Sequence, residues 1–430
     1  MEGLGAGGEQ GERVHSGLSK KRVLIIGGGI AGLSAARELA RFDINVDLVE
    51  KSVFPGGHAI QYACKATDEC VKCGACLVED SLKEVVQEQR IHLFAGSQVE
   101  GITKGDRFSV KVFGRPHSID PEKCVACGNC RDICPVEGAI VRGTSKNQKP
   151  FYAIDEAVCL YHLDRSCDKC QDVCPEKAIN LEEKGSRLLL ASDAIIVATG
   201  FEAFDPKDKP YGAGRFENVI TNLDLERMLR QEALVKRPSD EQEPKSMAFI
   251  QCVGSRDAKL NHLWCSKVCC PSALRMARLI KSRQSGIKIT FFYIDIQTFG
   301  KDFDSFYHML KSDIRMIRTI PGDIFEVEDK SLRLCYFDGG TEESREDLFD
   351  LVVLSVGIQP GRDNRDLADL LSVDLDDSGF FPGCESSVSG TWKGVFTAGT
   401  ANGPMSIPET MNHALSTTFK VVKYLESGDC

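Results

Sequence analysis

Apolar and polar residues follow one another along the chain in the way typical of α/β proteins, where buried strands alternate with amphipathic helices. Apolar runs bounded by glycine or charged residues predict strands within the segments 23–26, 45–50, 192–204, 247–257, 287–296, 350–360 and 394–404. Apolar positions at helical spacing predict helices within 33–42, 272–283 and 407–425. This order predicts two α/β units. The last strand and helix of the chain are expected to return to the first unit and complete it.

A glycine-rich turn links the first strand to the first helix. Its sequence "GGGIAG" places Gly27, Gly29 and Gly32 in the pattern G-x-G-x-x-G, and the second strand ends at Glu50. Such glycines let a pyrophosphate approach a helix N-terminus, and an acid at this place accepts from an adenosine ribose. We therefore expect a dinucleotide site; the alternative is a glycine-rich turn of another α/β domain. The candidate contacts here are Gly27, Gly29, Ile30, Ala31, Gly32, Glu50, Lys51, Gly57 and His58.

Two later strands indicate which dinucleotide binds. One ends in Ala198-Thr199-Gly200, and the other runs through Gly399-Thr400 into the helix predicted at 407–425. This order resembles flavoproteins of the thioredoxin-reductase and glutathione-reductase type, whose first fingerprint holds FAD. In that family a Gly-Asp pair usually stands at the position that Gly399-Thr400 occupies in this chain. The resemblance implies FAD and a helix N-terminus aimed at the flavin. Further candidate contacts are Thr199, Gly200, Gly399, Thr400 and Ile407.

Composition and charge narrow the class of protein. The 430 residues are 42% hydrophobic and 27% charged, as in soluble globular proteins, and the net charge of −10 argues against general nucleic-acid binding. No apolar run reaches the ~18 residues of a membrane span, and residues 1–20 lack the apolar core of a signal peptide. We expect a flexible N-terminal tail and a cytoplasmic protein. In a reducing compartment, the 19 cysteines are better explained as metal ligands than as disulfides.

Eight cysteines form two runs of the bacterial ferredoxin type. The first has the spacing C-x2-C-x2-C-x3-C-P, and the second has a longer first gap but keeps the final Cys-Pro. In two-cluster ferredoxins the fourth cysteine of each run ligates the other cluster. We therefore assign one [4Fe–4S] cluster to Cys124, Cys127, Cys130 and Cys174, and a second to Cys159, Cys167, Cys170 and Cys134. The alternative for these runs is zinc, held by C-x2-C pairs.

Two further cysteine groups lie outside these runs. The early group, in "ACKATDECVKCGACLVED", follows the loop after Glu50, so we expect it near the flavin. The late group lies in "QCVGSRDAKLNHLWCSKVCC". We expect at least two early cysteines and the late group to bind iron–sulfur clusters, with the two groups either sharing one cluster or holding one each. The alternatives are buried thiols and, for the late group, a redox dithiol. The candidate ligands are Cys64, Cys70, Cys73 and Cys76 in the early group and Cys252, Cys265, Cys269 and Cys270 in the late group.

The late group stands where a second dinucleotide fingerprint would be expected. After the strand that begins at Met247, only Gly254 remains of the glycines, and Cys252 and Val253 occupy the turn. The strand–helix–strand pattern is kept, so we expect a βαβ scaffold that has lost its pyrophosphate cradle. We interpret the stretch as a former NAD(P) site converted to an iron–sulfur site. No acid–base pair is evident, and we expect His58, His162, His262 and His413 to be ordinary surface or loop residues, with His58 the best candidate for a role.

Several of these segments together resemble one family. These segments are the first fingerprint, the inserted ferredoxin, "QCVGSRD", "WCSKVCC" and "GTANGPMSIPET". Together they resemble the A subunit of heterodisulfide reductase and its relative in the quinone-interacting membrane-bound oxidoreductase complex. The resemblance implies a thioredoxin-reductase-like fold, one FAD, several [4Fe–4S] clusters and electron transfer from a low-potential donor to iron–sulfur partner subunits. Some members split an electron pair at the flavin; nothing in this sequence shows that step.

The expected organisation follows from these segments. Its parts are a tail at 1–20, an FAD-binding unit from 21–117, 185–244 and 345–430, a ferredoxin insert at 118–184, and a degenerate nucleotide-binding unit at 245–344. The resemblance implies partner subunits like the B and C subunits, and a donor of the hydrogenase, ferredoxin or formate-dehydrogenase type. Membrane association would come only through partners, and a homodimer stays open. The alternative functions are an NAD(P)H-dependent reductase and a redox sensor or electron carrier without turnover.

Overall fold

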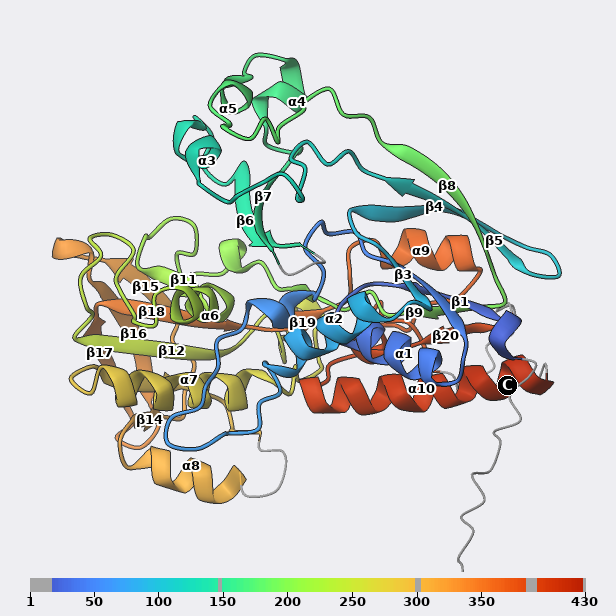
Figure 1. The fold of residues 1–430 in the computed structure, drawn as a ribbon. Coiled ribbons are helices and arrows are strands. Elements are labelled where there is room, and N and C mark those ends of the chain that lie inside the picture. Colours follow the sequence, from blue (N-terminus) through green and yellow to red (C-terminus); the bar gives the residue numbers. More distant parts are fainter. Residues whose placement is uncertain (1–17, 146–148, 298–302, 384–392, 428–430) are drawn as a thin grey trace, which may run out of the picture.

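The computed structural model describes residues 18–145, 149–297, 303–383 and 393–427, and its first unit contains a five-stranded parallel sheet (Figure 1). The strand order is β20-β9-β1-β2-β3. These strands are β1 (Arg22–Ile26), β2 (Asn45–Val49), β3 (Ile91–Phe94), β9 (Ala194–Val197) and β20 (Val395–Thr397). The strands predicted in the first 50 residues and around residues 195 and 396 are thus present, and β3 was not predicted.

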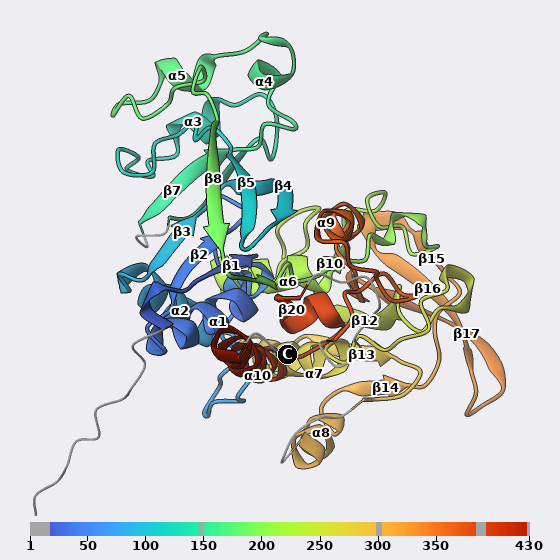
Figure 2. The same cartoon turned by 90° about the vertical axis from the view of Figure 1, so that its right-hand side faces the viewer.

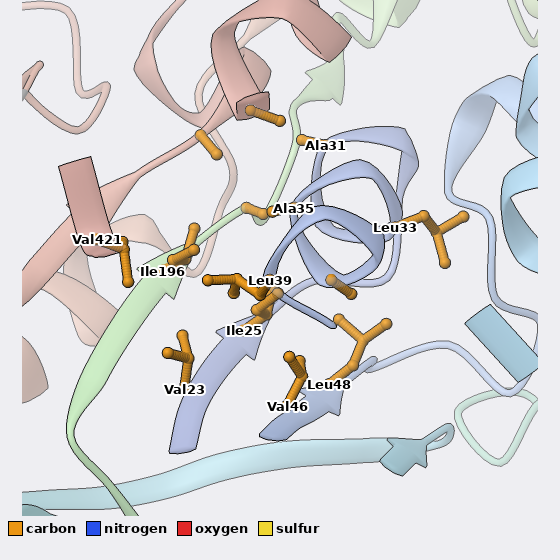
Figure 3. Close-up of a cluster of buried hydrophobic side chains, with 14 of the residues drawn as sticks. Val23, Ile25, Ala31, Leu33, Ala35, Leu39, Val46, Leu48, Ile196 and Val421 are labelled. Atoms are coloured by element: carbon orange, nitrogen blue, oxygen red, sulfur yellow. The ribbon is translucent and has the colours of Figure 1, made fainter. Parts of the chain in front are cut away.

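Three helices cover one face of this sheet. They are α1 (Ile30–Arg41), α2 (Leu77–Gln87) and α10 (Ile407–Ser427). Alternate residues of β1 point to opposite faces. Val23 and Ile25 join the core under the helices (Figure 3), and Leu24 joins the core on the other side of the sheet. Small residues at Ala31 and Ala35 let α1 lie close to the sheet and to α10. The sheet is therefore buried on both faces.

The opposite face is covered by a three-stranded antiparallel sheet and one helix. These elements are β4 (Ser97–Lys104), β5 (Phe108–Gly114), β8 (Ser186–Ser192) and α9 (Asn364–Leu371). The ferredoxin-like insert leaves at the end of β5 and returns at the start of β8, where Gly114 pairs with Ser186. Figure 2 shows β8 running between the insert and the first unit.

The insert is closed at its base and has little regular structure. Ile119 and Ile179 form an antiparallel bridge, and Asp120 N–H donates to Ala178 O at 2.8 Å. Its elements are α3 (Asn129–Ile133), β6 (Ile140–Thr144), β7 (Pro150–Ile154), α4 (Leu160–Asp164) and α5 (Lys169–Asp172). The ring of Phe151 packs on that of Phe54 at 5.0 Å between centroids, which ties the insert to the loop after β2.

The second unit repeats the arrangement on a second five-stranded parallel sheet, with the order β11-β18-β12-β13-β14. Its strands are β11 (Val219–Thr221), β12 (Ser246–Val253), β13 (Lys288–Phe292), β14 (Arg315–Ile317) and β18 (Leu351–Val356). One face carries α6 (Asn222–Gln231), α7 (Cys269–Arg283) and α8 (Phe303–Lys311). The other carries the antiparallel strands β15 (Asp323–Glu326), β16 (Leu332–Asp338) and β17 (Glu343–Phe349).

Short elements complete the chain. The strands β10 (Glu202–Ala203) and β19 (Ile358–Gln359) pair with each other and link the two units. The 3₁₀ helices are η1 (Leu18–Lys20), η2 (His58–Gln61), η3 (Pro206–Asp208), η4 (Ala258–Leu260), η5 (Glu328–Lys330) and η6 (Gly399–Asn402). Among the described helices, none is long and apolar enough to cross a lipid bilayer.

The topology corrects the expected boundaries in two places. The segments 185–244 and 345–430 were assigned wholly to the FAD-binding unit, but β11, α6 and β18 belong to the second sheet, so the second unit begins before 245 and ends after 344. A three-residue strand such as β11 carries too short a pattern to reveal its partner. The expected tail 1–20 lies mainly outside the described residues; residues 18–20 form η1, in which Leu18 is buried.

Candidate flavin and iron–sulfur sites

The first fingerprint forms the expected tight turn between β1 and α1. Gly27 has φ +111°, and a Cβ there would lie 2.2 Å from Ala198 O at the end of β9. A Cβ on Gly32 would lie 1.9 Å from Gly27 O, so only glycine lets the first turn of α1 come this close to the strand. A Cβ on Gly29, in contrast, would meet only Gly57 Cα, at 3.9 Å, which is ordinary van der Waals contact. The N-terminus of α1 is thus less crowded at Gly29 than at Gly27 and Gly32, which suits a pyrophosphate.

Glu50 lies beside this turn and accepts two backbone hydrogen bonds. One carboxylate oxygen accepts from Gly28 N–H and the other from Ser52 N–H, both at 2.6 Å. Burial raises the pKa of this carboxyl, and the two hydrogen bonds partly oppose that shift. A carboxylate has acceptor capacity for more than two donors, so ribose hydroxyls can be added. Lys51 points elsewhere and forms an exposed ion pair with Asp363.

The loop after Glu50 lies directly against the fingerprint. Gly29 and Gly56 form a parallel bridge, and a Cβ on Gly57 would come within 3.1 Å of Gly29 Cα. The His58 ring stacks on Phe201 at 4.6 Å, and its Nε2 lies 3.0 Å from the Phe201 carbonyl oxygen. The structure thus brings His58 to the predicted site, although its contacts alone assign it no chemical role.

The last segment of the chain closes the same edge of the first sheet. Gly399 has φ +69°, and a Cβ there would lie 2.6 Å from that of Ala31. Thr400 Oγ1 is the nearest atom to a Cβ on Gly200, at 4.0 Å, so the segments that follow the paired strands β9 and β20 lie next to each other. Thr199 follows Ala198 after β9, and a Cβ on Gly27 would lie 3.0 Å from its backbone nitrogen. The predicted residues of the three segments therefore meet at one site.

His413 was expected to be an ordinary surface or loop residue, but it lies on α10 and contacts this site. Its Nδ1 accepts from Gly399 N–H at 2.9 Å. Burial, and then the charge of Lys420, lowers the pKa of His413, so the ring is neutral and accepts at this atom. Nothing in the sequence signals this contact, since His413 and Gly399 are joined only by the folding of α10 onto the turn.

The eight ferredoxin-like cysteines surround two separate cavities. One is lined by Cys124, Cys127, Cys130 and Cys174. The other is lined by Cys134, Cys159, Cys167 and Cys170. Each cavity thus takes three cysteines from one run and the fourth from the other run. Burial raises the pKa of Cys130 to about 11 and that of Cys170 to about 12, so a cluster that binds these residues must displace their protons.

The early cysteine group lies in an extended segment between the two units. Burial, with the neighbouring thiols of Cys73, Cys64 and Cys70, raises the pKa of Cys76, which places the four sulfurs near one another. A Cβ on Gly74, at φ +81°, would lie 2.9 Å from Ile407 Cγ2 at the first residue of α10. The group therefore touches the helix end predicted to face the flavin.

The late cysteine group gathers at the N-terminus of α7. Burial raises the pKa of Cys252 to about 12 and that of Cys270 to about 11, and it raises the pKa of Cys269 strongly. Each of these shifts has a further contribution from Cys265, so the four thiols lie together. Cys252 and Val253 were expected in the turn, but both lie within β12. Cys252 has φ +62°, where the register of β12 with β18 shifts between Ile250 and Val253.

The turn after β12 has no room for a pyrophosphate. Gly254 has φ +80°, and a Cβ there would lie 2.1 Å from Cγ of Phe204, so the Phe204 ring covers the turn. His262 Nδ1 lies 3.0 Å from the Gly254 carbonyl oxygen on the same loop. The next α-helix, α7, does not begin until Cys269, and only the 3₁₀ helix η4 lies between. A dinucleotide fingerprint needs a short turn directly into a helix, which this loop is not.

No three His, Cys, Asp or Glu side chains within the described ranges are arranged tightly enough to hold one metal ion as they stand. A four-iron cluster takes each cysteine on a different iron atom, so its ligands lie farther apart than those of one zinc ion. The assignments of ligands to clusters stay predictions.

Comparison with known proteins relates these sites to characterised sequences. The description "NAD(P)-binding Rossmann-like domain" matches residues 25–88, and "4Fe-4S binding domain" matches residues 117–138. The chain is similar in fold to the thioredoxin reductase of Lactococcus lactis, with a TM-score of 0.53 at 15% identity, covering 95% of this chain and 99% of that one. The expected thioredoxin-reductase-like fold with a ferredoxin-type insert is confirmed.

Curated sequences give a more specific relationship. The A subunit of the H(2):CoB-CoM heterodisulfide,ferredoxin reductase of Methanothermobacter marburgensis is 33% identical over 91% of this chain and 62% of its own length. The iron-sulfur A subunit of the CoB--CoM heterodisulfide reductase of Methanocaldococcus jannaschii is 34% identical over 92% and 63%. The chain thus spans about three fifths of these relatives. Over that span, the resemblance inferred from the motifs is confirmed: the chain is homologous to the A subunits of heterodisulfide reductase.

Proposed function

We propose that this chain is the FAD- and [4Fe–4S]-containing subunit of an oxidoreductase complex, in which it passes electrons between a low-potential donor and iron–sulfur partner subunits. The observation that carries the proposal is the pair of cavities in the insert, each lined by four cysteines. The names of the relatives, which include heterodisulfide, ferredoxin and H2, support an oxidoreductase of this kind.

The flavin would be held by residues from three segments. The turn at Gly27, Gly29 and Gly32 would take the pyrophosphate, and Glu50 would accept from the ribose hydroxyls. The N-terminus of α10, at Ile407, would place its positive dipole end beside the isoalloxazine. FAD, when bound, supplies the exchange between two-electron and one-electron transfer. The chain's own part is to position this group and to set the charge around it.

The cysteines would provide the path for single electrons. Each cavity of the insert would hold one cluster, and the early and late groups would each hold another, because the four thiols of each group lie together. The early group touches the start of α10 through Gly74, which makes it the best candidate for the step nearest the flavin. Within the described ranges no disulfide joins any cysteines, which suits a reducing cytoplasmic compartment.

A direct NAD(P)H reductase is the main alternative, and one observation weighs against it. The ring of Phe204 covers the turn at Gly254, where the second pyrophosphate would have to lie. We therefore propose that reducing equivalents arrive through a protein donor of the hydrogenase, ferredoxin or formate-dehydrogenase type. Electron bifurcation is not part of the proposal, because no described residue distinguishes a flavin with one acceptor from a flavin with two.

Counts of iron and acid-labile sulfide per FAD, made anaerobically, test the cofactor assignment. About sixteen irons are expected, four for each of four clusters; about eight would restrict the clusters to the insert. Mixing the loaded chain with NADH, and separately with a reduced low-potential ferredoxin, tests the donor. We expect the flavin absorbance to bleach with ferredoxin only; fast bleaching with NADH would favour the reductase, and bleaching with neither donor would favour the sensor.

A further inference from the structure

A buried ion pair connects the early cysteine group to the second unit. Lys65 directly follows Cys64 and is 3% exposed, while Glu226 on α6 is 2% exposed. Lys65 Nζ donates to a Glu226 carboxylate oxygen at 2.7 Å, and Lys65 Nζ also donates to Ala63 O at 3.0 Å. A buried ion pair stabilises a fold less than an apolar pair of the same volume would, because both charges lose their water. Such a pair can instead hold the two segments that carry it in one fixed arrangement.

Glu226 is also the acceptor that links both cysteine groups. Its carboxylate accepts from Ala63 N–H at 3.1 Å, on the segment that carries Cys64. It also accepts from Ser272 Oγ at 3.3 Å, and Ser272 is in the first turn of α7, two residues after Cys270. One buried carboxylate therefore holds the start of the early group and the helix turn of the late group.

Two other ion pairs near this segment are more exposed. Arg230 on α6 forms an ion pair with Glu79 and donates to Tyr62 O, and Arg278 on α7 lies 3.9 Å from Glu69 (Figure 1 shows the segment between η2 and α2 running beside α7). Exposed ion pairs of this kind contribute little to a fixed geometry, because water screens them and the side chains stay mobile. They provide a matched control for the buried pair.

We propose that Lys65 and Glu226 are positioning residues that fix the distance between the early and the late cysteine groups. The inference rests on the proposed function, since it needs a cluster in each group. The step that they govern is the transfer of one electron from a reduced cluster in one group to an oxidised cluster in the other. No bond forms or breaks in this step, so its rate depends on the separation and the surroundings of the two clusters.

The test compares four variants with the wild-type chain: Glu226→Gln, Lys65→Met, the double variant Lys65→Met/Glu226→Gln, and Arg230→Gln as control. Each variant is loaded anaerobically with FAD and iron–sulfur clusters, and its iron and sulfide are counted. Its clusters are then reduced with dithionite. Electron paramagnetic resonance then measures the spin–spin coupling between neighbouring reduced clusters. Hydrogen–deuterium exchange measures the opening of residues 62–76.

We expect Arg230→Gln to match the wild type. Each buried single variant should weaken the coupling and speed exchange in 62–76 by about tenfold. The double variant removes both charges together, so it should regain thermal stability and full iron content while its coupling stays weak. Wild-type coupling in a fully loaded double variant would overturn the inference and leave the proposed function intact. Clearly fewer than about sixteen irons per FAD in the wild-type chain would overturn the cluster assignment, and the inference with it.

Discussion

At the residue scale, the contacts of Gly32 explain why the first turn of α1 tolerates no side chain. A Cβ at this position would meet Gly27 O at 1.9 Å, and neither backbone can yield without moving the turn itself. We expect Gly32→Ala to shift the turn and to lower the FAD content of the purified chain at least about tenfold, a loss of roughly 1.4 kcal/mol in binding. The flavin absorbance per chain measures this.

A matched glycine separates this effect from a general response to alanine. At Gly286, between α7 and β13, a Cβ would have no atom within 4 Å. Gly286→Ala should therefore keep the wild-type FAD content. If the two variants bind FAD equally well, the fingerprint does not hold the pyrophosphate.

The buried carboxyl group of Glu50 predicts that FAD binding depends on pH. Its pKa is raised by burial from the usual 4.5, and it must be ionised to accept from the ribose hydroxyls. FAD affinity should therefore fall as the pH drops through the raised pKa, and Glu50→Gln should lose this dependence. For the chain without FAD the sign is opposite: the folded state binds this proton more tightly than the unfolded state, so the contribution to stability is lost as the pH rises. Titrating FAD binding of both proteins across mildly acidic pH measures the difference.

Individual contacts could be predicted only where a motif fixes them. The three glycines and Glu50 follow a spacing that has one structural solution, and they meet in the structure as expected. Lys51 was included as a candidate contact for its position after Glu50, but its ammonium group pairs with Asp363, more than 300 residues away. Long-range partners of this kind, including His413 with Gly399, leave no local pattern in the sequence.

At the scale of elements, each ferredoxin-like run contributes its fourth cysteine to the cavity of the other run. Cys174 belongs to the second run but lines the cavity of the first, beside Cys124, Cys127 and Cys130. We expect Cys174→Ser to remove the cluster of the first run, with a loss of about four irons per chain and of one of the two ferredoxin-type signals. Mössbauer spectroscopy or iron analysis measures the loss.

Cys335→Ser is the control for this change, because Cys335 lies on β16 outside all four groups. Its substitution should leave the iron count unchanged. An unchanged count in Cys174→Ser as well would contradict the assignment of this residue as a ligand.

The elements of the two parallel sheets were largely predictable, whereas their partners were not. The apolar runs near 23, 45, 247 and 351 form β1, β2, β12 and β18. The short strands β11 and β14, and the antiparallel layers β4–β5–β8 and β15–β16–β17, were not predicted, since their half-exposed residues give weaker patterns. The domain boundaries were displaced for the same reason.

At the scale of the whole molecule, the chain enters and leaves the insert at neighbouring positions on the first unit. The insert begins and ends at Gly114 and Ser186, which are paired neighbours on β5 and β8, so a short hairpin turn can join them directly. We expect a chain in which such a turn replaces residues 115–185 to fold, to keep FAD with weaker affinity, and to lose about eight irons. The weaker affinity follows from losing the contact of Phe151 with Phe54, in the loop that borders the fingerprint.

Iron and flavin counts on this shortened chain, with circular dichroism to check folding, measure the result. A folded shortened chain that binds no FAD at all would show that the insert is part of the flavin site rather than an addition to it.

The ring of Phe204 over Gly254 sets what it would take to install a nicotinamide site in the second unit. The ring would have to be removed, a short glycine turn built, and the loop before α7 shortened, because a dinucleotide fingerprint leads from the strand directly into a helix. A single substitution therefore cannot supply such a site.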